Sequence, residues 1–77
     1  MADVALLDQA LLNVVGPAWT KVAMVLARAA KEPKLDFDDH TDRFEVLAER
    51  VCALVEAGLL IARGNTQEWR FSEVRKA

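Results

Sequence analysis

The last third of this 77-residue chain constrains its fold most, because a long amphipathic helix is followed there by two short strand-like runs. From Phe44 onward, apolar residues recur at spacings of three and four, the period of a helix with one buried face. Thr41 or Asp42 can cap the start of this helix, and Gly58 suits the left-handed position after its end. The expected buried stripe is Phe44, Leu47, Ala48, Val51, Leu54 and Val55.

The two strand-like runs are residues 59–63 and 68–74, with a turn at residues 64–67. Alternating residues that flank a short Gly- and Asn-containing turn predict a β-hairpin. Trp69 and Phe71 are two residues apart, so we expect both on the inner face of this hairpin.

Two further helices are predicted before this unit. Asp3 can cap the first, Gly16 ends it, and Pro17 favours the first turn of the second. Pro33 stops the second helix by about Glu32, and a polar loop with room for a short edge strand near residues 35–37 follows. The expected inward residues are Val4, Leu7, Leu11, Val14 and Val15 in the first helix and Trp19, Val22, Ala23, Leu26, Ala29 and Ala30 in the second.

Three helices and a C-terminal β-hairpin predict one α+β domain over residues 1–77, winged-helix-like in architecture. The length leaves no room for a second domain. Roughly eight to ten residues separate the second and third helices, whereas the DNA-binding helix-turn-helix uses a turn of about three or four. The similarity is therefore to winged helices in general, which bind either nucleic acid or proteins.

Composition narrows the classes of function. Ten Lys and Arg against twelve Asp and Glu give a net charge of −2, the wrong sign for a protein held mainly by phosphates. An apolar share of 53% exceeds what one buried face per helix needs, which favours self-association. No apolar run reaches the ~20 residues that span a bilayer, no secretory leader is evident, and one cysteine forms no internal disulfide. We expect a cytoplasmic protein that does not enter a membrane.

The side of the third helix opposite its buried stripe carries small and apolar residues flanked by Glu45, Glu49 and Glu56 on one edge and by Arg43 and Arg50 on the other. Glutamates repel phosphates, so this side suits a protein partner better than DNA, although an ordinary solvated face stays open. The first helix adds apolar residues away from its main stripe, which form a homodimer surface or pack within the fold. The candidate partner-binding residues are Leu6, Leu12, Val46, Arg50, Ala53 and Ala57.

A DNA-binding regulator is the alternative. It would use the third helix and a basic hairpin, with Trp69 nearby, although Glu68 and Glu73 interrupt the positive charge. Both tryptophans are expected mainly as core residues. The candidate nucleic-acid contacts are Lys21, Arg28, Arg63, Arg70 and Arg75.

No residues form a catalytic, cofactor or metal site by pattern, so the chain is expected to be no enzyme and to need no cofactor. The acidic segment 36–42 fails as a calcium loop, because Thr41 replaces the required Gly and Leu47 the bidentate Glu. A weak divalent site in this segment stays open. His40 lacks a second zinc ligand, and Cys52 has no base beside it in sequence other than His40.

Several short motifs resemble the C-terminal portion of an uncharacterised bacterial family of domains of unknown function. They are Leu54-Val55-Glu56-Ala57-Gly58-Leu59-Leu60, Arg63-Gly64 and Trp69-Arg70-Phe71-Ser72-Glu73-Val74-Arg75, with an earlier match over residues 11–23. The resemblance covers about two thirds of the chain and implies a winged-helix-like fold, without an activity or catalytic residues. Glu49 departs from it, because relatives carry an aromatic residue before the arginine.

The polar residues Ser72, Glu73 and Arg75 in the most specific of these motifs are open to two interpretations. They are structural, with Arg75 pairing to Glu73 or to a helix end, or they belong to an exposed strand edge that binds a partner. The structural interpretation is the one we expect.

Overall fold

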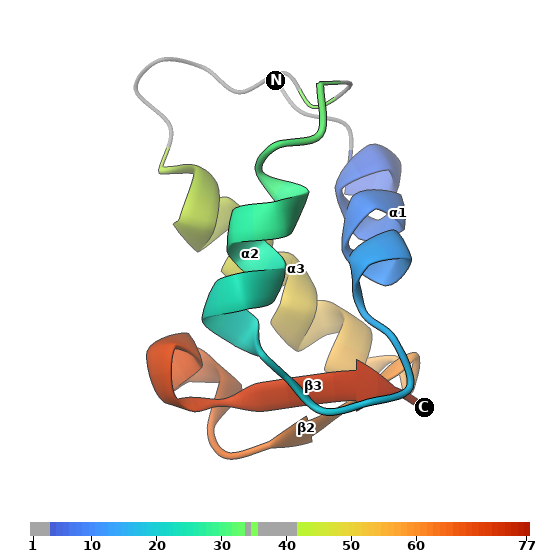
Figure 1. The fold of residues 1–77 in the computed structure, drawn as a ribbon, viewed down its shortest axis with the longest axis vertical. Helices are drawn as coiled ribbons and strands as arrows, with labels where there is room; N and C mark the ends of the chain where they lie inside the picture. Colours follow the sequence, from blue (N-terminus) through green and yellow to red (C-terminus); the bar gives the residue numbers. More distant parts are fainter. Residues whose placement is uncertain (1–3, 34, 36–41) are drawn as a thin grey trace.

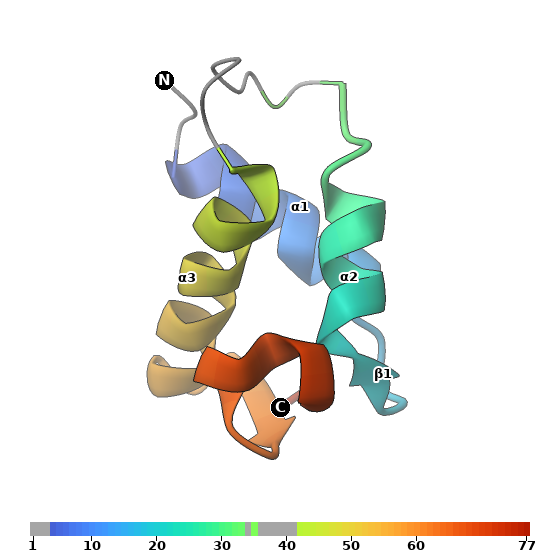
Figure 2. The ribbon, with the colours of Figure 1, turned by 90° about the vertical axis from the view of Figure 1, so that its left-hand side faces the viewer.

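The computed structural model describes residues 4–33, 35 and 42–77 (Figure 1). Three helices and a three-stranded antiparallel sheet form an α+β fold, as predicted. The elements in chain order are α1 (Val4–Val14), β1 (Thr20–Lys21), α2 (Val22–Ala29), α3 (Arg43–Glu56), β2 (Leu60–Arg63), the 3₁₀ helix η1 (Thr66–Phe71) and β3 (Glu73–Lys76). The helices lie on one side of the sheet (Figures 1 and 2).

The last strand, β3, lies at the centre of the sheet, whose order is β1-β3-β2. Val74 pairs with Thr20 on one side and with Ala62 on the other, and its side chain is fully buried beneath the helices. Because side chains alternate along a strand, Glu73 and Arg75 belong to the opposite face. The hypothesis of a partner-binding edge on the last strand is therefore wrong, since both its edges are paired.

The core fills the space between the helices and the inner face of the sheet. Each helix contributes a buried stripe at helical spacing, and most of its residues are those predicted. Val4, predicted to face inward, is nevertheless 50% exposed, and Val25, outside the predicted stripe, is fully buried. The largest fully buried side chains are Leu11, Leu26, Leu47, Leu60, Val15, Val22, Val25, Val51 and Val74, together with Ser72. Among the described residues, every helix is too short or too polar to span a bilayer.

Helix α3 begins and ends as its sequence predicts. Oδ1 of Asp42 accepts hydrogen bonds from the N–H groups of Phe44 and Glu45, at 3.1 and 3.2 Å, and so caps the helix. Gly58 has a φ of +83°, the left-handed conformation expected after a helix end. Phe44, however, remains 39% exposed, with its ring against Trp69 instead of within the main core.

The second helix is shorter than predicted. Pro17 does not start it, because Thr20 and Lys21 pair with β3, and the N–H of Val22 donates to the carbonyl of Ser72 at 3.0 Å. Helix α2 therefore begins only at Val22, and Trp19 lies beside the sheet instead of in a helical stripe. Pairing with a strand some fifty residues away overrides the local helical pattern.

The predicted strand over residues 68–74 is wrong in its first half, where the chain forms η1. The side chain of Asn65 accepts a hydrogen bond from the N–H of Gln67 at 3.0 Å and so caps this turn. Trp69 points inward and is 8% exposed, whereas Phe71 is 84% exposed, so the two do not share an inner face. Asp3 and residues 36–41 of the candidate divalent-ion segment lie outside the described residues. Of the short edge strand predicted near residues 35–37, Leu35 alone is described, and it lies in no strand.

Candidate functional site

The face of the sheet turned away from the helices carries the most distinctive group of exposed and half-buried side chains. Paired residues form two rows across this face. Lys21, Glu73 and Arg63 form the first row, and Arg75 and Ile61 form the second. Trp19, just before β1, joins the second row. We call this surface the open sheet face; it consists of Trp19, Lys21, Ile61, Arg63, Glu73 and Arg75.

Two arginines of the open sheet face contact the ring of Trp19. The guanidinium carbons of Arg63 and Arg75 lie over its ring, 4.4 and 5.3 Å from the ring centroid. Arg63 comes from β2 and reaches across the central strand, where its Nη2 also lies 2.8 Å from Oε1 of Glu73. These contacts hold an aromatic ring and two planar cations in a defined arrangement.

Glu73 pairs with Arg63 and not with Arg75, so that part of the predicted pairing is wrong. Nη1 of Arg75 donates instead to the carbonyl of Lys76, at 3.2 Å. Neither Lys21 nor Arg75 has a carboxylate partner within the part of the chain that the structure describes. The open sheet face thus carries three cations and one carboxylate on a chain whose net charge is −2.

The outer side of α3 presents three exposed glutamates, Glu45, Glu49 and Glu56. Of the predicted partner-binding residues on this helix, Val46 packs against the core, Ala53 is half-buried and Ala57 is exposed.

Arg50, another predicted partner-binding residue, is used within the chain. Its Nε and Nη2 donate to the two carboxylate oxygens of Asp8 on α1, at 2.8 and 3.0 Å. The hydrogen bond to Asp8 raises the pKa of Arg50, against a smaller opposing effect of desolvation. The ion pair thus joins α1 to α3 and leaves Arg50 positively charged.

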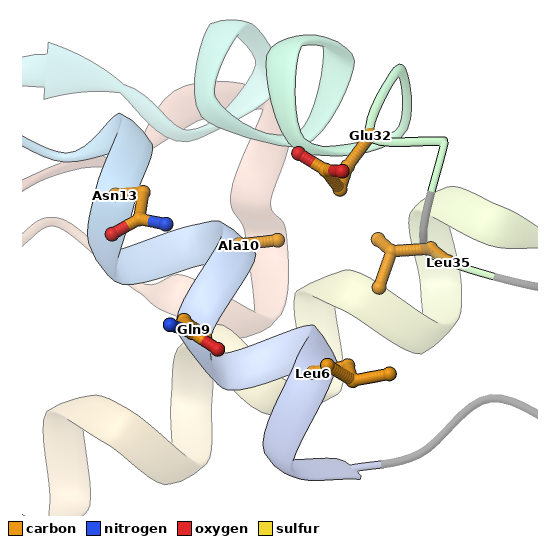
Figure 3. A pocket seen from close by; sticks show the side chains of 6 residues that line it. All are labelled: Leu6, Gln9, Ala10, Asn13, Glu32 and Leu35. Carbon is orange, nitrogen blue, oxygen red and sulfur yellow. The ribbon is translucent and has the colours of Figure 1, made fainter.

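The two leucines predicted to bind a partner differ in position. Leu12 is half-buried and packs against the core, whereas Leu6 is 37% exposed. Leu6 lines a hollow of about 70 Å³ between α1 and the segment after α2 (Figure 3). Small-molecule sites typically measure about 300–1,000 Å³, so this hollow is too small for one. Its other lining residues are Gln9, Ala10, Asn13, Glu32 and Leu35.

A wider groove of about 220 Å³ runs between α3 and η1. Glu45, Ala48, Glu49 and Cys52 line it from α3, and Gln67 and Trp69 line it from η1. Within the described ranges, no three His, Cys, Asp or Glu residues are placed to hold a metal ion. The groove is thus lined by an aromatic residue and two small residues, with two glutamates beside them.

Three of the five predicted nucleic-acid contacts, Lys21, Arg63 and Arg75, come together on the open sheet face. Arg28 lies on α2, and Arg70 lies on η1 with its guanidinium 4.5 Å from the ring centroid of Trp69. Sequence reasoning placed Trp19 in a helical core stripe and did not single out Ile61. Trp19 belongs to this face because residues 20–21 form a strand, and Ile61 because it pairs with Arg75 of β3.

Comparison of the chain with models of protein families, with curated proteins and with solved structures found no match. Membership of the domain family that the C-terminal motifs resemble therefore stays a prediction.

Proposed function

We propose that this protein is a non-enzymatic, cytoplasmic module that binds another protein through its open sheet face. One observation carries the proposal: Trp19 lies under two arginines on a sheet face that none of the described helices covers. Tryptophan and arginine dominate the residues that contribute most to protein–protein binding. Ile61, 38% exposed, adds apolar area beside them.

The contacts among these side chains favour binding because they order the surface before a partner arrives. Arg63 is held by Glu73 and Trp19, and Arg75 by Trp19 and the carbonyl of Lys76. An immobilised flexible side chain costs about 0.5–1.5 kcal/mol on binding, and part of that cost is already met in the free protein.

DNA binding is the second candidate, favoured by the gathering of Lys21, Arg63 and Arg75 on one face. Two observations weigh against it. Glu73 neutralises Arg63 at 2.8 Å, and the exposed side of α3, the helix that would read the major groove, carries Glu45, Glu49 and Glu56. Each glutamate would repel a phosphate backbone, so we favour a protein partner.

In-cell photocrosslinking tests this proposal. A photoreactive phenylalanine analogue replaces Ile61 on the open sheet face, and a matched control replaces Met24, which is 49% exposed on α2. We expect discrete, nuclease-resistant protein adducts from position 61 and none from position 24. Lys21→Glu in the same chain should abolish them, because it reverses a charge on the open sheet face.

Two results would count against the proposal. Absence of any adduct at position 61 would leave the open sheet face without a partner. Nuclease-sensitive adducts there would support the DNA-binding alternative instead. Mass spectrometry of the adducts identifies the protein captured, including another copy of the chain.

A further inference from the structure

We infer that the open sheet face binds a second copy of this chain, which presents the acidic side of α3. The inference rests on the proposed function and names its partner. The acidic surface consists of Glu45, Glu49 and Glu56, with the groove between α3 and η1 beside it. We call it the acidic helix face.

The acidic helix face is a continuous stripe. Residues four apart lie on the same side of a helix, and positions 45, 49 and 56 fall within about 40° of one another at 100° per residue. All three glutamates are exposed, and none pairs with a lysine or arginine that the structure describes. The negative charge of this stripe is therefore not neutralised by those residues.

The open sheet face is its counterpart. Lys21 and Arg75 lack carboxylate partners among the described residues, and Trp19 and Ile61 supply apolar area beside Arg75. Beside the acidic helix face, Ala48 and Trp69 line the groove but are only 5% and 8% exposed. The two surfaces thus match chiefly in charge, which favours their association.

The two surfaces belong to different elements, so the contact between copies joins unlike patches. Such a contact is head-to-tail, and it produces a ring or an open chain instead of a two-fold dimer. In a linear assembly every copy then uses both surfaces, except the copies at the two ends. Blocking either surface should therefore stop growth. A mixture of molecules with a blocked sheet face and molecules with a blocked helix face should keep one working contact.

Light scattering on the purified protein tests this directly. We expect the mass to rise above the 8.6 kDa of one chain as concentration increases from about 10 µM to about 1 mM. Raising the salt from about 50 mM to about 1 M should reverse the rise, because salt screens exposed charges.

Two charge-reversed variants make the test specific. Lys21→Glu with Arg75→Glu reverses the open sheet face, and Glu45→Lys with Glu49→Lys reverses the acidic helix face. We expect each variant alone to associate at least about tenfold more weakly. An equimolar mixture should restore association, because the intact sheet face of one variant meets the intact helix face of the other, and the two reversed faces are again opposite in charge.

A matched control, Arg28→Glu with Lys31→Glu, makes the same charge change as the sheet-face variant on exposed residues outside both surfaces and should associate like the unaltered chain. Lys21→Glu alone serves if loss of Arg75 from Trp19 unfolds the double variant. Restored association of the mixture also shows that both double variants remain folded.

The inference is wrong if the unaltered chain stays monomeric at every concentration, or if a dimer persists in both double variants. A monomer that still crosslinks to a different protein at position 61 would contradict this inference alone and leave the proposed function standing. A monomer without any crosslink would overturn both.

Discussion

Trp69 and Phe71 lie two residues apart in η1, yet one is buried and the other almost fully exposed. In an extended strand they would share a face. The 3₁₀ turn rotates the chain between them, so that the Trp69 ring meets Phe44 edge-on at a centroid distance of 6.0 Å. The main-chain conformation at this single site decides which aromatic residue stabilises the fold.

This difference predicts unequal effects of truncation. Trp69→Ala should lower the free energy of unfolding by about 3–5 kcal/mol, because it removes a large buried ring. Phe71→Ala should change it by no more than about 0.5 kcal/mol, as for other exposed positions. Urea unfolding of the two variants measures both values. Equal losses would indicate a regular hairpin with both rings inward.

At the scale of the elements, the end of α3 depends on one glycine. Gly58 has a φ of +83°, a conformation that costs an L-residue with a side chain about 1–2 kcal/mol. No atom lies within 4 Å of the position that a Cβ would occupy there, so space is not the constraint. The turn from α3 into β2 therefore depends on backbone conformation.

Gly58→Ala should accordingly destabilise the protein by about 1–2 kcal/mol. Gly16→Ala is the matched control, because Gly16 also has no atom within 4 Å of a Cβ and its φ is not positive. That control should be neutral or stabilise by up to about 1 kcal/mol through a less flexible unfolded chain. Thermal unfolding of both variants compares them, and a similar loss for each would contradict the assigned role of Gly58.

At the scale of the whole molecule, the ion pair between Asp8 and Arg50 joins α1 to α3. The two residues are 42 positions apart in the sequence. Its side chains are 23% and 30% exposed, so water screens much of the attraction. Because the pKa of Arg50 is raised in the folded protein, its contribution to stability is fully present below the pKa of an unfolded arginine and is lost only as pH rises through the folded value. Near neutral pH, therefore, Arg50 itself causes no pH dependence.

A double-mutant cycle with Asp8→Ala and Arg50→Ala measures this pair. We expect a coupling free energy of about 0.5–1 kcal/mol at low salt, since the geometry is bidentate but partly exposed. About 1 M salt should reduce the coupling, whereas a buried contact would keep it. A coupling near zero at both salt concentrations would mean that packing alone joins α1 to α3.

The sequence by itself determined the α+β class, most of the buried residues of the three helices, and both ends of α3. These features depend on interactions within a few residues: helical periodicity, the Asp42 cap and the left-handed Gly58. They could be predicted because neighbouring residues contain all the groups involved. The basic residues of the candidate nucleic-acid site were also identified from the sequence, but the sequence did not show that Lys21, Arg63 and Arg75 gather on one face.

Only the tertiary structure decided the position of β1, the central place of β3 and the open sheet face. Thr20 and Lys21 become a strand because Val74 and Glu73 offer main-chain partners more than fifty residues later, and no local pattern encodes that pairing. The same pairing moves Trp19 from a helical stripe onto the sheet beside Arg63 and Arg75. The tertiary structure likewise assigns Arg50 to Asp8, because the long-range packing of α1 on α3 selects the partner of this partly exposed charge.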